Sequence, residues 1–226
     1  MRIAWRQICL NGLWIAGASL MMANIAKAEV PFFKASVSAG TMPPMEERLP
    51  KTPLVVTPME EQTIGEYGGD LRTLVGGPSD VKLMFVNGYA RLVGFTPELE
   101  IEPDILEAME VEEGRVFTMT LREGHKWSDG TPFTSEDFRY WWEDIAQNPK
   151  LSPAGPPASL LIDGELPKVE FPDERTVIYS WSKPNPNFLS DLAGAAPLLI
   201  YRPAHYLKNH HEDHIDRSKL TPKQKI

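Results

Sequence analysis

The residue types best suited to chemistry in this sequence are four histidines near its C-terminal end: His205, His210, His211 and His214. Imidazole nitrogens bind zinc and carry protons near neutral pH. On a helix, His210 and His214 would share one face, and Glu212 or Asp213 could supply a third metal ligand. However, zinc hydrolases need the order His-Glu-x-x-His, and this segment reads His-His-Glu-Asp-His. We therefore favour a solvated charged tail and expect no bound metal.

A second group that could do chemistry is the loop of residues 76–80, which begins Gly76-Gly77-Pro78-Ser79. Glycines have no side chain, so a ligand can approach the exposed backbone N–H groups closely, as in peptide recognition by strand addition. An ordinary turn explains the same residues equally well. We carry these four residues forward as candidate ligand-binding residues.

Signals for catalysis are weak throughout. The sequence has no Gly-x-Ser-x-Gly elbow and no phosphate-cradling loop, and its single cysteine is Cys9. Acidic residues stand at turns and helix starts, and Asp129 is better explained as a turn residue than as a general acid. We expect a protein that is not an enzyme and needs no cofactor.

Residues 1–28 have the pattern of a cleaved secretory signal peptide. Arg2 and Arg6 precede an uncharged, mostly apolar stretch, which ends at the small-x-small site Ala26-Lys27-Ala28. Without the three basic residues of this segment, the 23 basic residues of the chain fall to 20 against 31 acidic ones, a formal charge of −11. So acidic a chain is unsuited to nucleic acid, and we expect a monomer in the periplasm.

The next part of the chain is rich in proline and shows no sustained hydrophobic period. Residues 29–64 are expected to be an extended linker. Residues 65–80 then carry a short strand at 71–75, and a helix is expected over 81–92. Apolar residues at 105, 106, 108 and 109 favour a brief helix there.

The most informative segment is a strand followed by a tight turn and an aromatic helix. Residues 116–121 alternate in polarity, which predicts a half-buried strand, and Asp129-Gly130 is a strong turn pair. Thr134 can cap the following helix, and Asp137 can reach back to it. We predict that one face of this helix packs on the strand, at Phe138, Trp141, Trp142 and Ile145.

Further elements are expected toward the C-terminal end. Residues 168–171 and 176–181 predict a hairpin, with Val177, Tyr179 and Trp181 on one face. Residues 188–193 predict a short capped helix, 195–201 a buried strand or strand-like segment, and 202–207 another helical turn.

Four elements in this order resemble family 5 of the extracellular solute-binding proteins of ABC transporters, which bind oligopeptides, dipeptides or nickel. The resemblance covers residues 65–211. Its carrying segments are Gly68-Gly69-Asp70-Leu71-Arg72, Phe117 to Gly124 with Trp127 to Thr134, Glu136-Asp137-Phe138 with Trp142-Glu143, Val169 to Asp173, and Pro203-Ala204-His205-Tyr206-Leu207.

The resemblance implies an α/β fold of the type II-like periplasmic binding proteins, with two lobes joined by a hinge and an extra small α+β domain. It implies that residues 65–80 begin lobe one, 81–200 form the extra domain, and 201–226 start the return to lobe one. Asp129, Gly130, Thr134, Asp137, Phe138 and Trp142 would be a signature that maintains the fold. The implied partners are a peptide-like solute and the permease and ATPase of the transporter at the inner membrane.

Family members are considerably longer than this sequence, and their second lobe lies C-terminal to the Pro-x-His-Tyr-Leu element. We therefore expect that these 226 residues do not bind solute alone. Two alternatives stay open. One is a secreted stand-alone interaction module, and the other is a metal-dependent hydrolase that uses the C-terminal histidines.

Overall fold

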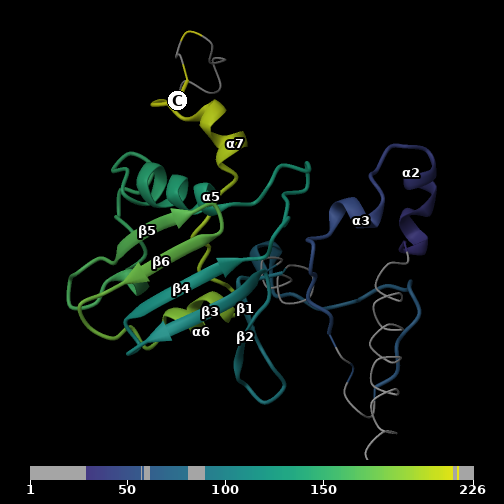
Figure 1. Ribbon diagram of the computed structural model, residues 1–226, viewed down its shortest axis with the longest axis horizontal. Coiled ribbons are helices and arrows are strands. Elements are labelled where there is room, and N and C mark those ends of the chain that lie inside the picture. The colour runs from purple at the N-terminus through teal and green to yellow at the C-terminus, as the bar shows by residue number, and fades with distance from the viewer. Residues whose placement is uncertain (1–28, 57, 59–61, 81–89, 216–217, 219–226) are drawn as a thin grey trace, which may run out of the picture. The chain divides into compact units, whose positions relative to one another are not determined.

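The computed structural model describes residues 29–56, 58, 62–80, 90–215 and 218 (Figure 1). The predicted signal peptide and residues 81–89 of the predicted helix lie outside them. The chain divides into two compact units. The first comprises Met1–Leu49 and Val55–Leu71, and the second comprises Pro50–Leu54 and Arg72–Ile226.

The described start of the first unit is helical, so the prediction of an extended linker over residues 29–64 was wrong there. Its elements are η1 (Pro31–Phe33), α2 (Lys34–Ser38) and α3 (Met45–Arg48). Pro31 begins η1 and Pro44 precedes α3, positions where a missing N–H costs nothing, whereas Pro50 and Pro53 lie outside the helices. Glu29 holds the unit together: its carboxylate accepts the N–H of Met45 at 3.0 Å and pairs with Arg48 at 2.5 Å.

The strand predicted at residues 71–75 is not formed. None of the described strands pairs with this segment, and Leu74 is fully exposed. A strand needs a neighbour for its backbone N–H and C=O groups, and apolar composition does not supply one. The segment is therefore irregular and belongs to none of the described strands.

The second unit is built on a four-stranded antiparallel sheet with the order β3-β4-β6-β5, beside a two-stranded pair, β1-β2. Figure 1 shows the four strands lying side by side. The strands are β1 (Val93–Phe95), β2 (Ile101–Pro103), β3 (Leu106–Glu112), β4 (Val116–Leu121), β5 (Lys168–Asp173) and β6 (Thr176–Ser180).

Strand β3 replaces the brief helix that the sequence favoured, so that prediction was wrong. The register against β4 shifts between Leu106 and Ala108, and beyond this irregularity Met109 lies opposite Met119. One extra residue in a strand moves the following apolar side chains out of the two-residue period. This shift produced the helix-like spacing of the apolar positions.

Strand β4 and the β5–β6 hairpin confirm their predictions. Phe117, Met119 and Leu121 are buried on one face of β4, and Val177 and Tyr179 are buried on β6. Phe117 pairs with Tyr179, and Met119 pairs with Val177, so these side chains form one apolar layer.

Two helices cover this layer. Helix α5 (Ser135–Tyr140) continues as a π-helical turn, η3 (Trp141–Ala146), and α6 (Phe188–Ala193) follows the hairpin. The helix stripe is buried in one core cluster with Phe117 and Met119 of β4, as predicted. Its ring contact with the sheet is to β6, where Trp142 lies 6.4 Å from Tyr179 between ring centres, and Phe188 of α6 lies 5.0 Å from Phe117. The wider π turn lets adjacent Trp141 and Trp142 both be buried.

The chain after α6, residues 194–215, crosses back toward α5 and is called the return segment. The burial expected of residues 195–201 is confirmed at Ile200, but the segment is irregular and forms no strand. The described sheet does not include it. The predicted helical turn is present as α7 (Ala204–Leu207), followed by η5 (Lys208–His210); the remaining short element is η4 (Ala158–Leu160).

Candidate functional site

The Asp129-Gly130 turn is fixed by a hydrogen bond from the backbone to the Asp129 side chain and by the conformation of Gly130. The Asp129 carboxylate accepts the N–H of Thr131 at 3.0 Å, and Gly130 has a φ of 89°, which favours glycine. The Thr131 N–H, together with the His205 side chain 2.7 Å away, lowers the pKa of Asp129 to about 2. A carboxyl group that stays ionised is poorly suited to donate a proton as a general acid.

Asp137 is the polar centre of the signature. It is 3% exposed, and its carboxylate accepts three hydrogen bonds of 3.0 Å: from the N–H of Thr134, from the indole N–H of Trp127 and from the N–H of Ala204. The first bond is half of a capping box that starts α5. Burial raises the pKa of Asp137, while these N–H donors oppose the rise. One side chain therefore fastens the turn, the helix start and the return segment.

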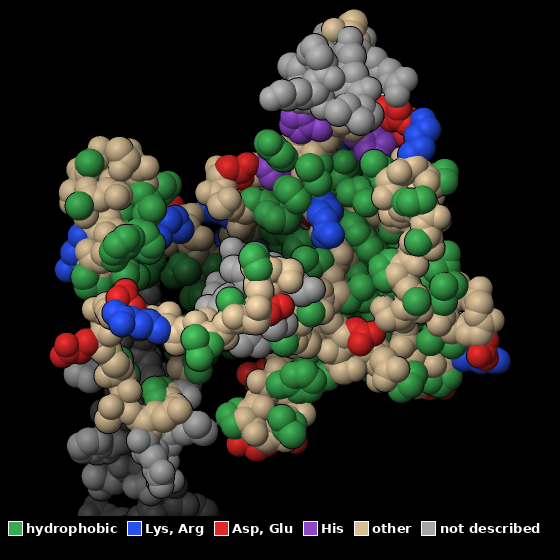
Figure 2. Space-filling model, turned by 180° about the vertical axis from the view of Figure 1, so that it is seen from behind, with side chains coloured by type: hydrophobic (Ala, Val, Ile, Leu, Met, Phe, Trp, Pro, Cys, Tyr) green, Lys and Arg blue, Asp and Glu red, His purple; other side chains and the backbone are tan. Residues whose placement is uncertain are grey.

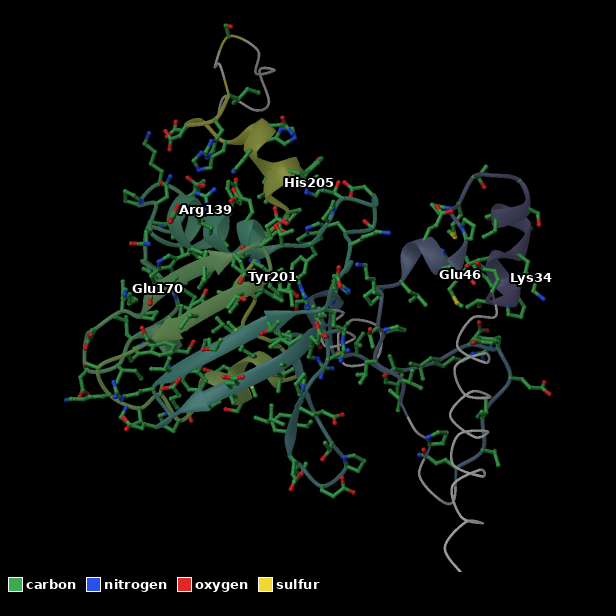
Figure 3. All side chains as sticks on the ribbon, in the orientation of Figure 1. Lys34, Glu46, Arg139, Glu170, Tyr201 and His205 are labelled. Atoms are coloured by element: carbon green, nitrogen blue, oxygen red, sulfur yellow. The ribbon has the colours of Figure 1, made fainter. Side chains whose placement is uncertain are left out.

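An aromatic cluster surrounds this carboxylate. Phe133 contacts Trp127 at 5.3 Å, Tyr201 at 5.1 Å and Phe138 at 5.5 Å between ring centres. In Figure 3, Tyr201 lies on the segment that leads into α7, and His205 lies on α7 itself. Three signature residues, Asp129, Asp137 and Phe138, thus contact residues 201–205, which lie 63 to 76 positions later in the chain. Gly130 and Thr134 shape the turn and the helix start beside them.

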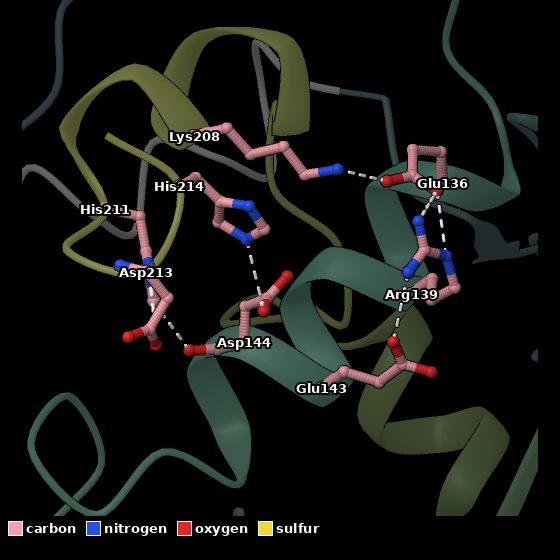
Figure 4. Close-up of polar contacts among 8 residues, drawn as sticks. All are labelled: Glu136, Arg139, Glu143, Asp144, Lys208, His211, Asp213 and His214. Atoms are coloured by element: carbon pink, nitrogen blue, oxygen red, sulfur yellow. Dashed lines mark hydrogen bonds and ion pairs between the residues drawn. The ribbon is translucent and has the colours of Figure 1, made fainter. Parts of the chain in front are cut away.

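The histidine cluster does not form the metal site that was considered. η5 ends at His210 and His211 is extended, so His210 and His214 do not share a helix face. His211 and His214 instead contact Asp144 on η3, through its carbonyl oxygen at 3.1 Å and its carboxylate at 3.3 Å (Figure 4). Within residues 29–215, as far as they are described, no three His, Cys, Asp or Glu side chains are placed to hold a metal ion.

Charged pairs extend this contact along α5. Lys208 pairs with Glu136 at 2.5 Å, and Arg139 bonds to both Glu136 and Glu143 (Figure 4). Figure 2 shows histidine side chains gathered at this end of the second unit, with acidic and basic side chains beside them.

A concave surface lies between the return segment and the start of η3. It encloses about 580 Å³, and Trp141 forms part of its wall. Arg202 contributes to the wall and donates to the carbonyl oxygens of Leu199 and Tyr201, and burial lowers its guanidinium pKa. We call this surface the return-segment hollow; its other lining residues are Pro157, Ser159, Ser190, Asp191, Gly194, Ala196, Pro197, Leu198 and Leu199.

The return-segment hollow was missed by sequence reasoning. Trp141 was assigned to the core, which is correct for most of its surface, since it is 4% exposed. The signal that could have found the hollow is residues 194–199, where small and apolar residues follow a helix without alternating. The hollow meets the signature at Arg202, whose N–H donates to the carbonyl of Asp137 at 3.0 Å.

The candidate loop Gly76-Gly77-Pro78-Ser79 forms a turn at the start of the second unit. The N–H of Gly77 donates to the Asp80 carboxylate at 3.0 Å, so this donor is already occupied. Neither glycine has a positive φ, although a side chain on Gly76 would meet Asp80 at 3.0 Å. Solute binding by this loop stays a prediction.

The described helices include none that is long and apolar enough to cross a membrane.

Comparison with known proteins shows which protein family the chain resembles in sequence and structure. The family described as "Bacterial extracellular solute-binding proteins, family 5 Middle" matches residues 100–223. The chain is 30% identical over 195 residues to the periplasmic α-galactoside-binding protein of Rhizobium meliloti, covering 77% of this chain and 28% of that protein. It is 40% identical over 68 residues to the periplasmic oligopeptide-binding protein OppA of Salmonella typhimurium, covering 30% of this chain and 12% of that protein.

Solved structures agree. An oligopeptide-binding protein OppA matches with a TM-score of 0.71 and 34% identity, covering 86% of this chain and 30% of that chain. The periplasmic binding protein MelB of Agrobacterium fabrum C58, in complex with stachyose, matches with a TM-score of 0.64 and 28% identity, covering 85% and 31%. The sequence thus spans less than a third of the length of these relatives. The expected type II-like binding-protein fold is confirmed, and the chain belongs to family 5 of the bacterial extracellular solute-binding proteins.

Proposed function

We propose that this chain forms part of the periplasmic binding component of an ABC importer for peptide-like solutes. The observation that carries the proposal is the match to an oligopeptide-binding protein over 86% of this chain. In this proposal, residues 1–28 direct export, and the protein acts as a monomer that delivers solute to a permease and its ATPase. Its work is binding and release, with no chemical step.

The return-segment hollow is the proposed solute-facing surface of the second unit. Its wall offers what a peptide needs. Pro197 and Leu198 are apolar, Ser159 and Ser190 carry hydroxyls, and the irregular segment 194–199 has backbone groups outside any sheet. Asp191 adds an acidic group that suits a basic side chain or amino group. Gly76, Gly77, Pro78 and Ser79 are retained as a second proposed contact.

An oligosaccharide is the second candidate solute, since one relative is named for α-galactosides and one solved relative holds stachyose. The hollow favours the peptide. Trp141 is its one aromatic lining residue among those described and is 4% exposed, so it offers little ring face for a sugar to stack on.

The test is calorimetric titration of the complete binding component in which this chain is proposed to take part, with a mixture of tripeptides and, separately, with stachyose, since these 226 residues are not expected to bind solute alone. Ala196→Trp places a large side chain in the hollow, and Ala108→Trp makes the same change on the exposed part of β3. We expect tripeptide binding in the native protein and in Ala108→Trp, and at least a tenfold weaker affinity in Ala196→Trp. Tripeptide affinity that is equal in both variants would remove the hollow from the proposal, and binding of stachyose alone would replace the solute.

A further inference from the structure

His211 is a buried polar residue that solute binding does not use. The residue is 5% exposed and does not line the return-segment hollow. It lies where the chain leaves η5, against the C-terminal part of the helix formed by α5 and η3 (Figure 4).

The two ring nitrogens of His211 have opposite partners. Nδ1 accepts the backbone N–H of Asp213 at 3.2 Å. Nε2 lies 3.1 Å from the carbonyl oxygen of Asp144, which can only accept a hydrogen bond. The contacts therefore fix one neutral form of the ring, with its proton on Nε2. A second proton on Nδ1 would point at the Asp213 N–H, and that hydrogen bond would be lost.

The turn after His211 depends on this residue. The His211 carbonyl accepts the N–H groups of His214 at 3.1 Å and Ile215 at 3.0 Å. Together with the bond from the Asp213 N–H to Nδ1, three described hydrogen bonds of this turn are accepted by His211. Earlier parts of the return segment have separate attachments, at Ala204 to Asp137 and at Lys208 to Glu136.

The charged groups around the ring do not compensate for a second proton. On the helix, the Asp144 carboxylate already faces His214 at 3.3 Å, and the Tyr140 ring lies 6.0 Å away with Lys208 over it. On the return segment, the Asp213 carboxylate is 3.7 Å from Nδ1, and the Asp213 side chain is 67% exposed. This carboxylate would attract a proton on Nδ1, but the exposed pair is screened by water and offsets only part of the lost Asp213 hydrogen bond.

We propose that His211 is a proton-sensitive catch, which keeps residues 211–215 docked on the helix while its ring is neutral and releases them when the ring is protonated. His214 acts in the opposite direction, because its protonation strengthens its pair with Asp144. The two effects are separable by substitution. Attachments at Ala204 and Lys208 confine the release to the part of the return segment beyond η5.

The test is backbone hydrogen exchange of residues 213–215 in the full chain at pH 7.5 and pH 5.0, corrected for the intrinsic dependence of exchange on pH. His211→Gln keeps a donor and an acceptor but cannot take up a proton. Release of the turn on protonation would expose the N–H groups of residues 213–215, so we expect about tenfold faster exchange in the native chain at pH 5.0 than at pH 7.5. We expect a change of less than about twofold in His211→Gln, and acceleration in His214→Gln as in the native chain.

Equal acceleration in the native chain and in His211→Gln would overturn the proposal, and so would constant exchange in the native chain. A measurement on the native chain alone guards against a misfolded variant. Nitrogen shifts of the labelled His211 ring at pH 7.5 should show a neutral ring with the proton on Nε2. A proton on Nδ1, or a charged ring, would refute the catch.

Discussion

Asp137→Asn is the substitution that probes the architecture most directly, because one buried carboxylate joins three parts of the second unit. In the native chain, one carboxylate oxygen accepts from Thr134 and Trp127, and the other accepts from Ala204. Asparagine has nearly the same shape but only one acceptor oxygen. Whichever way the amide turns, its NH₂ group faces at least one N–H donor.

The least costly orientation leaves the amide oxygen on Thr134 and Trp127 and turns the NH₂ group toward the N–H of Ala204. A hydrogen bond to a charged group contributes about 1.5–3 kcal/mol, and a buried donor without a partner costs about 1–3 kcal/mol. Removing the buried charge offsets part of this loss, since burial raises the pKa of Asp137. We expect a net loss of about 2–3 kcal/mol in the free energy of unfolding.

The assay is thermal unfolding followed by tryptophan fluorescence. A loss of this size lowers the midpoint by about 5–10 °C in a chain of this length. Asp163→Asn is the matched control: Asp163 is exposed, pairs with Lys183 at 2.5 Å, and should leave the midpoint within about 2 °C. Because the native pKa of Asp137 is raised, native stability gains relative to the variant as the pH falls through it. A variant as stable as the native chain at pH 7 would refute the role of this carboxylate.

Three further predictions concern single groups of the second unit. Tyr179→Phe should raise the free energy of unfolding by about 1 kcal/mol, because the buried Tyr179 hydroxyl has no hydrogen-bond partner among the described residues. The exposed substitution Tyr206→Phe is the control in the same denaturant titration. A destabilised Tyr179→Phe would mean that the hydroxyl has a partner. Gly130→Ala should cost about 1–2 kcal/mol in chemical unfolding because of its φ of 89°, whereas Gly94→Ala, without a positive φ, should not; equal effects would contradict the strain argument. Asp129 has a lowered pKa, so its contribution to stability is present above pH 4 and disappears as the pH falls toward 2. In acid titrations followed by circular dichroism, Asp129→Asn should lose less stability than the native chain over that range. An equal loss would argue against the contacts of Asp129 with Thr131 and His205.

The predictions from sequence succeeded where hydrophobic period and turn chemistry act over a few residues. Strand β4 alternates without interruption, and the stripe from Phe138 to Trp142 keeps helical spacing, so both could be recognised. Strand β3 was mistaken for a helix because the irregularity near Ala108 disturbs its period. The strand expected at residues 71–75 failed for a different reason, since pairing depends on a neighbour that composition does not reveal.

The candidate sites were harder to predict because their contacts join distant parts of the sequence. Asp137 could be recognised as a helix cap, but its bond to Ala204 spans 67 positions. The histidines suggested a metal because they are close in sequence, whereas the fold turns His211 and His214 toward Asp144, 67 and 70 positions earlier. Local patterns carry no information about which surface such a segment meets.

The helix of α5 and η3 has two faces with different physical responses. One face carries aromatic side chains against the sheet, and contacts such as Trp142 with Tyr179 are insensitive to pH below the range of tyrosine ionisation. The other face presents Glu136 and Asp144 to Lys208 and the histidines of the return segment, and these contacts depend on protonation. In the proposed catch, a fall in pH therefore acts on residues 211–215 of the return segment and leaves the aromatic contacts with the sheet intact. Residues 194–202 line the hollow and are attached separately at Asp137, so the end of the segment can be released while the hollow keeps its shape.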